Sequence, residues 1–316
     1  AQNLASLCHA TNPIDENRSF GTGRRLAQRY VIIMEKITKQ EALKGYQPEP
    51  TSFDDRSALI RHVAALSPDA PGKADAQDGA SPITGTSAEA SRRLESVDPS
   101  GYARSRNFLI GKVTMLSPYI RHGMISLDAA RDKALSRVKR AADAEKLVQE
   151  LAWRDYWQRV QRMHPDWLWD DAEAYKTGFA ATEYSADLPD DIERGETGVA
   201  VIDGIIHELR QTGYIHNHTR MYLAAYIVHW RRVRWQAGAR FMLTHLIDAD
   251  QASNNLSWQW VASTFSRKPY IFNLENVRKY ASDQLNTDDR HNVPLAASYE
   301  VLTARLFPKM ELAPHG

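Results

Sequence analysis

Residues 246–260 read Leu-Ile-Asp-Ala-Asp-Gln-Ala-Ser-Asn-Asn-Leu-Ser-Trp-Gln-Trp and directly follow an apolar helical pattern. Asp250, Asn254 and Trp258 are four residues apart, so they share one face of a helix that starts near Asp250. An acid and an amide on one face suit a planar, polar ligand. The alternative is a capped helix, with Asp248 or Asp250 as N-cap and the tryptophans in the core. The stretch alone leaves both interpretations open.

A second stretch, residues 212–221, reads Thr-Gly-Tyr-Ile-His-Asn-His-Thr-Arg-Met. Asn217 and Met221 are four residues apart and therefore lie on one helix face. One interpretation is an ordinary helix start with Asn217 as the cap and Arg220 exposed. The other is that Arg220 pairs with a buried acid such as Asp248.

A third stretch, residues 150–157, reads Glu-Leu-Ala-Trp-Arg-Asp-Tyr-Trp. Glu150, Trp153, Arg154 and Trp157 form a face of aromatic rings with one acid and one base. The alternative to a functional face is a half-buried helix with an internal Glu150–Arg154 ion pair, which contributes only roughly 0.2–0.5 kcal/mol.

Composition limits the classes of protein to which this chain can belong. Its 316 residues are 43% hydrophobic, enough for one large or two small domains. The single cysteine, Cys8, excludes a disulfide framework and an iron–sulfur cluster held by several thiolates of this chain, and it favours a reducing compartment. No apolar run reaches the roughly 18 residues of a membrane span, and the N-terminus lacks the basic and apolar regions of a signal peptide, so we predict a cytoplasmic location. The histidines lack metal-site spacing, so we predict no metal.

The net charge of +1 hides an uneven distribution. Residues 214–240 contain five arginines, three histidines and no acid, whereas residues 164–196 carry ten acids against two basic residues. This distribution predicts one positive and one negative face. The arginines between Arg231 and Arg240 either contact a phosphate backbone or lie on the far side of the molecule.

Helical periodicity dominates the chain after residue 88, and the segments are separated by turn signals. No long strand-like alternation and no dinucleotide-binding glycine motif occurs. We therefore predict an all-α domain over residues 88–316. Its principal predicted helices are 127–138, 144–163, 199–212, 217–232, 237–247 and 252–263.

The first 87 residues differ in character from the rest. Residues 1–66 contain two helical patterns, Leu26 to Ile37 and Leu59 to Leu66, and are predicted to form a helical N-terminal extension. Residues 67–87 consist almost wholly of small, polar and proline residues, which predicts a flexible linker.

Six motifs occur in one order along the chain: Tyr102 with residues 114–126, Glu150–Tyr156, Gly195–Gly198 leading to Asp203, Thr212–Asn217, Arg220 with Met221 and Trp235, and Leu246–Ser263. Taken together, they resemble the FAD-binding half of the DNA photolyase and cryptochrome family. The resemblance implies an all-helical domain that holds FAD.

The resemblance assigns roles residue by residue. Thr114 and Ser117 match the donors to the FAD phosphates, Asn254 matches the residue that faces flavin N5, and Trp258 and Trp235 match the two inner tryptophans of an electron-transfer chain. The full set of implied cofactor residues is Tyr102, Thr114, Leu116, Ser117, Glu150, Arg154, Asn217, Arg220, Asp248, Asp250 and Asn254.

The same resemblance implies a substrate and a reaction. Glu150, Trp153, Met221 and Trp260 match the residues that hold a flipped-out pyrimidine dimer, so UV-damaged DNA is the implied partner. Light-excited, reduced FAD would split a cyclobutane dimer by donating an electron that later returns, with Glu150, Asn254, Trp258 and Trp235 as the implied catalytic residues.

The chain also departs from the family pattern. The N-terminal α/β antenna domain has no counterpart in the sequence, and only Tyr184 stands near the place of the outermost tryptophan. The alternative function is therefore a blue-light photoreceptor that binds FAD without repairing DNA.

Overall fold

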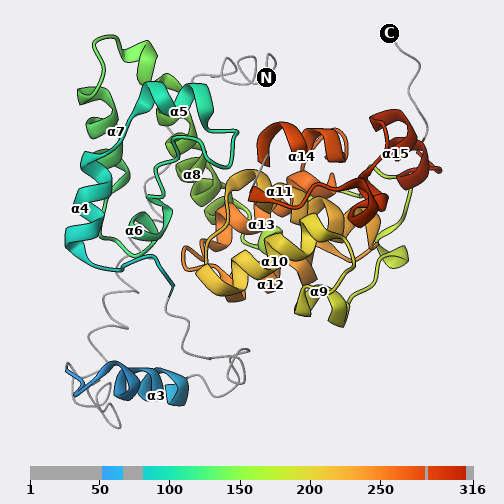
Figure 1. Cartoon of the computed structure of the whole chain (residues 1–316), viewed down its shortest axis with the longest axis horizontal. Helices are drawn as coiled ribbons and strands as arrows, with labels where there is room; N and C mark the ends of the chain where they lie inside the picture. Colours follow the sequence, from blue (N-terminus) through green and yellow to red (C-terminus); the bar gives the residue numbers. More distant parts are fainter. Residues whose placement is uncertain (1–51, 67–80, 282–283, 311–316) are drawn as a thin grey trace, which may run out of the picture. The chain divides into compact units, whose positions relative to one another are not determined.

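The computed structural model describes residues 52–66, 81–281 and 284–310 (Figure 1). The chain forms two compact units, Ala1–Ala70 and Pro71–Gly316. The first unit contains helix α3 (Arg56–Leu66), at the second of the two predicted N-terminal patterns. The pattern from Leu26 to Ile37, and residues 67–80 of the predicted linker, lie outside the described residues.

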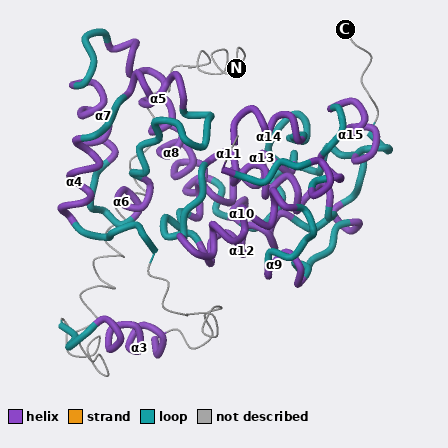
Figure 2. The backbone as a smooth tube through the Cα atoms, in the orientation of Figure 1, coloured by secondary structure: helices purple, strands orange, loops and turns teal. Residues whose placement is uncertain are grey.

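The described part of the second unit is built from helices, and Figure 2 shows helix and loop there without strands. Short 3-10 turns separate several of the helices. The helices are α4 (Ser87–Glu95), α5 (Pro99–Ser105), α6 (Ser117–Arg121), α7 (Leu127–Ser136), α8 (Glu145–Met163), α9 (Asp190–Arg194), α10 (Ala200–Thr212), α11 (Asn217–Ala225), α12 (Trp235–His245), α13 (Gln251–Ala262), α14 (Leu274–Ala281) and α15 (Tyr299–Leu306).

Local chemistry explains where these helices begin and end. The side chains of Thr86, Asp98 and Ser126 each accept a hydrogen bond from a backbone N–H in the first turn of the helix that follows. Gly195 and Gly213 end α9 and α10 with left-handed backbone, at φ +73° and +68°, where a side chain would be strained. The turn signals read from the sequence therefore have direct physical counterparts.

The described residues of the second unit contain two main hydrophobic cores and a third, small cluster of Leu302, Leu306 and Phe307. The smaller core joins α4 to α7 with the start of α8, and Leu116, Tyr119 and Leu147 are among its buried members. The larger core joins α10 to α14 around the fully buried Trp235. Helix α8 packs against α5 and α7 on one side and α13 on the other, so it connects the two cores.

The predicted continuous helix over residues 217–232 is wrong at its C-terminal half. Helix α11 ends at Ala225, and residues Tyr226–Trp230 continue as a π-helical turn. The wider turn accommodates the fully buried His229 and is followed by Arg232 in left-handed backbone, at φ +52°. Packing against the core therefore overrides the helical period here.

Residues 81–86 precede α4 as a loop that is hydrogen-bonded to other parts of the second unit. The Ser81 hydroxyl donates to the Thr212 carbonyl at 2.5 Å, and the Tyr119 hydroxyl donates to the Thr84 carbonyl at 2.8 Å. These bonds hold the end of the predicted linker against α10 and α6.

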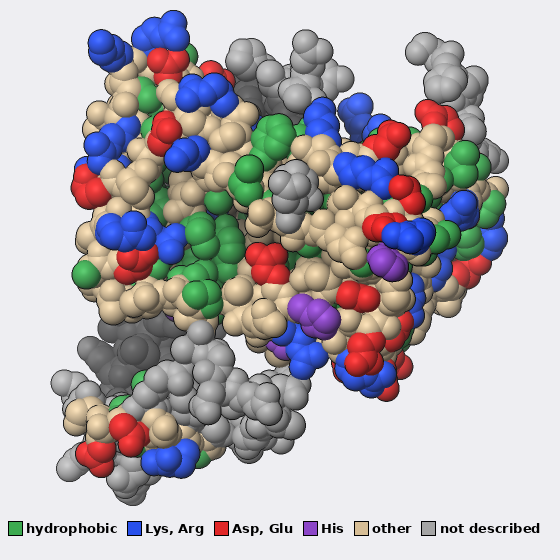
Figure 3. Space-filling model, viewed as in Figure 1, with side chains coloured by type: hydrophobic (Ala, Val, Ile, Leu, Met, Phe, Trp, Pro, Cys, Tyr) green, Lys and Arg blue, Asp and Glu red, His purple; other side chains and the backbone are tan. Residues whose placement is uncertain are grey.

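Acidic and basic side chains lie side by side on the face seen in Figure 3 rather than in separate patches. The acidic and basic stretches predicted to form opposite faces contact each other, because Arg231 pairs with Asp191 at 2.8 Å. Arg232 is also engaged internally, with its guanidinium over the Phe179 ring at 3.9 Å. The prediction of separate faces is therefore wrong for these residues.

Candidate flavin site

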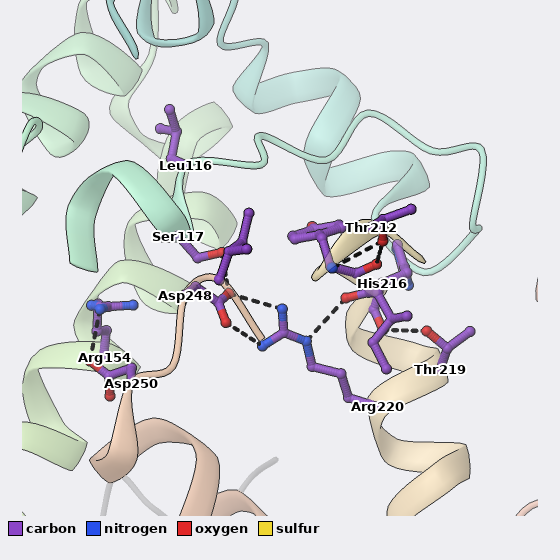
Figure 4. A network of polar contacts seen from close by, with 12 residues as sticks. Leu116, Ser117, Arg154, Thr212, His216, Thr219, Arg220, Asp248 and Asp250 are labelled. Atoms are coloured by element: carbon purple, nitrogen blue, oxygen red, sulfur yellow. Dashed lines mark hydrogen bonds and ion pairs between the residues drawn. The ribbon is translucent and has the colours of Figure 1, made fainter. Parts of the chain in front are cut away.

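Asp248 is the buried acid at the centre of the polar network in Figure 4. Its carboxylate accepts hydrogen bonds from the Arg220 guanidinium at 2.9 and 3.3 Å and from the Ser117 hydroxyl at 2.6 Å. Burial raises the pKa of this carboxyl, but Arg220 and Ser117 together lower it by more, so the pKa lies below its usual value. The structure thus confirms that Arg220 pairs with Asp248.

Asp250 has two roles at the start of α13. Its side chain caps the helix by accepting the Ser253 N–H at 2.8 Å. It also receives the Arg154 guanidinium at 2.7 Å and the Gln158 amide at 2.9 and 3.0 Å, both from α8. The alternative of an internal Glu150–Arg154 pair is therefore wrong, because Arg154 reaches across to α13 instead.

Glu150 faces two cations at the pocket described below. Its carboxylate lies 3.2 Å from the Arg106 guanidinium and 3.0 Å from the Lys146 ammonium. Burial, followed by the Glu150 charge, raises the pKa of Tyr102 to about 12. The predicted residues Tyr102 and Glu150 therefore sit together, and Arg106 completes this corner.

One pocket brings together residues from several separate segments of the chain. It contains about 590 Å³ of empty space, which includes its opening to solvent. The lining includes Glu150, five further residues predicted to bind the cofactor, and several residues for which the sequence predicted no role. The lining residues are Tyr102, Arg106, Val113, Thr114, Met115, Leu116, Ser117, Glu150, Tyr214, His216 and Asn217.

The loop before α6 has the backbone geometry of an anion-binding nest. Met115 adopts left-handed backbone at φ +51°, and the next residue, Leu116, is right-handed at φ −85°. Successive residues of opposite hand turn their N–H groups toward one concave side, where they suit a phosphate. Holding a methionine in this conformation costs roughly 1–2 kcal/mol, which the surrounding structure must offset.

His216, rather than Asn217, caps α11. Its Nδ1 accepts the His218 N–H at 3.1 Å, and Asn217 is the first helical residue, with its amide 3.6 Å from the Met221 sulfur. Burial lowers the pKa of His216, and burial together with the neighbouring His216 lowers that of His218 to about 4. The buried His216 Nε2, in the pocket wall, has no hydrogen-bond partner among the described residues.

Asn254, Trp258 and Trp235 lie at the contact between α12 and α13. The Asn254 amide donates to the Ala239 carbonyl at 3.2 Å. Trp258 is buried, its Nε1 is unpartnered among the described residues, and its ring abuts Gly238, where a Cβ would lie 2.3 Å from it. The three residues occupy adjacent helices, outside the pocket lining.

The predicted substrate residues are less closely grouped. The ring of Trp153 stacks on that of Trp157, also on α8, with the ring centroids 5.4 Å apart. The half-exposed Trp260 of α13 packs against Tyr270, with the ring centroids 5.6 Å apart. Met221 contacts Asn217 at the pocket edge. None of Trp153, Met221 and Trp260 lines the pocket described above.

These residues meet the chemical needs of a flavin dinucleotide. An anionic diphosphate would contact the nest at Met115 and the Arg106 guanidinium, and a heterocycle would meet the unpartnered His216 Nε2 in the pocket wall. Buried polar atoms without partners are costly, so a ligand that supplied partners would stabilise this arrangement. The donor set therefore fits FAD.

Fold and site define an all-helical flavin-binding domain, and the comparisons with known proteins agree. Residues 147–290 match the FAD-binding domain of DNA photolyase. A deoxyribodipyrimidine photo-lyase from Streptomyces griseus is 35% identical over 164 residues, which are 52% of this chain and 35% of that protein. Residues 147–290 therefore form an FAD-binding domain of the DNA photolyase type, and FAD is the cofactor of this domain, as predicted.

Solved structures show the same fold. A class III photolyase from Agrobacterium tumefaciens aligns with a TM-score of 0.57 at 24% identity, over 83% of this chain and 52% of that one. An archaeal photolyase from Sulfolobus tokodaii, solved with two FAD molecules, aligns with a TM-score of 0.52 at 29% identity, over 63% and 45%. The chain spans only about a third to a half of the length of the curated relatives that it matches.

Several residues that contact the site were not predicted from the sequence. Gln158 lies one helical turn after Arg154, so the four-residue spacing on α8 was a signal that could have found it. Arg106 and Asp171 had no such signal, because their partners Glu150 and Trp235 are distant in the sequence. Only the folded chain reveals these pairings.

None of the helices within residues 52–66, 81–281 and 284–310 is long and apolar enough to cross a membrane. Within the same ranges, no cluster of three or more His, Cys, Asp and Glu side chains could hold a metal ion.

Proposed function

We propose that this protein repairs cyclobutane pyrimidine dimers in UV-damaged DNA in a light-dependent reaction. The observation that carries the proposal is a pocket in which Glu150 and Asn217 lie beside the loop from Thr114 to Ser117. The pocket thus places a carboxylate of the implied substrate site beside the implied cofactor contacts. When bound, reduced FAD supplies a light-driven electron to the dimer and takes it back afterwards.

The protein would bind and orient both partners of this reaction. The nest at Met115 and the Arg106 guanidinium would hold the diphosphate, and the Asp248–Arg220 and Asp250–Arg154 pairs would fix the surrounding elements. Both carboxylates of these pairs are buried, so the helices α6, α8, α11 and α13 are connected by polar contacts of little mobility.

Glu150 would hydrogen-bond the damaged bases. The Arg106 guanidinium and the Lys146 ammonium lie within 3.2 Å of its carboxylate and hold it at the pocket. Trp153 and Trp260 would stack on bases that leave the duplex, and Trp260 already exposes 42% of its surface.

The proposal predicts a selective effect of Glu150→Gln. An oligonucleotide with one cyclobutane thymine dimer is mixed with reduced, FAD-loaded protein, with and without blue light, and the restored thymine is quantified. We expect E150Q to lower the light-dependent rate by roughly tenfold or more, because the amide cannot replace the charged acceptor. Bound FAD, measured by its absorbance, should not change.

Glu145→Gln is the matched control, because Glu145 is an exposed acid at the start of the same helix. It should repair like the unmodified protein. Bound FAD without any light-dependent restoration would contradict repair and support the photoreceptor alternative. Loss of FAD from E150Q would instead mean that Glu150 serves the cofactor.

The DNA-binding surface and the cytoplasmic location remain predictions. Arg231 and Arg232 make contacts within the protein, which favours the interpretation that they do not serve the phosphate backbone. The linker over residues 67–87 and the single domain over residues 88–316 also stay predictions.

A further inference from the structure

Trp235 has a second tryptophan beside it that the sequence motifs do not mark. The rings of Trp235 and Trp169 are parallel to within 5°, with centroids 6.5 Å apart. Trp235 is fully buried, whereas Trp169 is only partly buried and follows the 3-10 turn Asp166–Leu168. Trp169 thus lies between the innermost part of the core and solvent.

Polar groups around this ring pair favour positive charge on Trp235 and hold the local geometry. The Trp235 Nε1–H donates to the Asp171 carboxylate at 2.6 Å, and a nearby negative charge stabilises a cation radical on the indole. Gln236 donates both to this carboxylate, at 3.0 Å, and to the Trp169 carbonyl, at 3.2 Å. One side chain therefore fixes Asp171 and Trp169 relative to α12.

A pair of tyrosines, Tyr175 and Tyr184, is the competing source of an electron for oxidised Trp235. The Tyr175 hydroxyl lies 3.5 Å from the Trp235 backbone nitrogen, and its ring stacks on Tyr184 at 4.4 Å. Oxidation of a phenol requires loss of its proton. The Tyr184 hydroxyl is hydrogen-bonded to the Thr177 hydroxyl at 2.7 Å, and a hydroxyl is a poor base. Burial also raises the pKa of the Tyr175 and Tyr184 phenols.

We propose that Trp169 is the outer electron donor of this protein, in the sequence Trp169, Trp235, Trp258. The inference rests on the proposed flavin site, because it takes Trp258 as the first donor. Trp258 touches Gly238, one helical turn after Trp235 on α12, and both tryptophans belong to the same core. Tyr184 stands near the place where the family pattern has its outermost tryptophan, but in this proposal it takes no part in electron transfer.

Each transfer moves one electron and breaks no bond between heavy atoms. Illumination of oxidised, bound FAD draws one electron from Trp258, Trp235 replaces it, and Trp169 replaces the electron lost by Trp235. The cation radical on Trp169 then either releases its indole proton to water or takes an electron from a thiol in solution. The Arg240 guanidinium, 4.6 Å from the Trp169 ring centroid, disfavours the cation and so promotes loss of that proton.

The test compares single variants of the full-length, FAD-loaded protein: Trp169→Phe, Tyr184→Phe, Trp258→Phe and the control Trp167→Phe. Two quantities are measured after excitation of oxidised flavin. The first is the rate of steady flavin reduction in the presence of dithiothreitol, and the second is the lifetime of the tryptophan radical in transient absorption.

We expect Trp169→Phe to lower the reduction rate and shorten the radical lifetime by about tenfold or more, because the hole stays close to the flavin and recombines. Tyr184→Phe and Trp167→Phe should stay within about twofold of the unmodified protein. Trp167 is a suitable control because its ring stacks on His164 and contacts Phe265 instead of Trp235. Bound FAD and thermal stability, measured alongside, identify any variant that merely loosens the fold.

Unchanged kinetics in Trp169→Phe would overturn the proposal, and a loss in Tyr184→Phe alone would move the exit to the tyrosine pair. Unchanged kinetics in Trp258→Phe would refute a different statement, that Trp258 is the first donor in the flavin site. The experiment thus distinguishes failure of Trp169 as the outer electron donor from failure of Trp258 as the first donor to the flavin.

Discussion

At the scale of single residues, the buried acids and the buried histidines of the described part of the chain differ in how fully their polar atoms are hydrogen-bonded. Asp248 and Asp250 are buried and each faces an arginine. His229 is also buried; its Nε2–H donates to the Val261 carbonyl, 3.0 Å away, and its Nδ1 has no partner among the described residues. Asp248 therefore folds charged beside Arg220, and His229 folds neutral.

His229 therefore predicts a loss of stability in acid. Burial, and then the Arg232 charge, lower its pKa from 6.5 to about 3, with the Val261 carbonyl opposing them. The unfolded chain takes up a proton as the pH falls below 6.5, whereas the folded chain does not until about 3. The free energy of unfolding is thus highest above pH 6.5 and falls through this window, by at most about 1.4 kcal/mol per pH unit for this one group.

Urea unfolding at a series of pH values checks this, with His229→Asn as the comparison. The variant starts less stable, but its free energy of unfolding should decline less steeply between about pH 6.5 and pH 4.5. Equal slopes in the two proteins would show that His229 is not the group that titrates.

At the scale of elements, the contact between α12 and α13 depends on the absence of one side chain. A Cβ at Gly238 would lie 2.3 Å from Trp258 Cη2 and 3.1 Å from Ile227 Cγ2. Both neighbours are buried, so they have little room to move. The closeness of the two helices sets where Trp258 stands relative to Trp235.

We expect Gly238→Ala to lower the free energy of unfolding by roughly 1–3 kcal/mol, since overpacking outweighs the better helix propensity of alanine. Gly204→Ala is the matched control: Gly204 is also helical, in α10, and its Cβ would meet only Leu285 Cδ2 at 3.4 Å. That change should be neutral or stabilise by up to about 1 kcal/mol. Chemical denaturation measures both, and equal effects would argue against tight packing at Gly238.

At the scale of the whole molecule, the unit Pro71–Gly316 contains both described cores and every residue of the candidate site. A chain that starts at Pro71 should therefore fold cooperatively and retain FAD, as measured by bound-flavin absorbance and by a single thermal transition. A shortened chain that is purified without flavin, and cannot be reconstituted with it, would show that residues 1–70 complete the site.

The sequence by itself determined the features that depend on near neighbours. Helical period placed α8, α10, α12 and α13 to within two residues, because burial of one face repeats every three to four positions. The cap at Asp250 is of the same local kind, whereas FAD was implied by the resemblance of the six ordered motifs to a known family. Helical period and helix caps can be predicted from the sequence because the interacting residues lie within one or two helical turns of each other.

Only the tertiary structure decided which distant side chains meet. Arg154 had an acid at the right spacing on its own helix, yet it pairs with Asp250, 96 positions away, because α8 packs across the start of α13. Trp169 joins Trp235 for the same reason, and Glu150 finds Arg106 at the pocket. Such pairings depend on how helices pack against one another, and the spacing of residues along one helix carries no record of that packing.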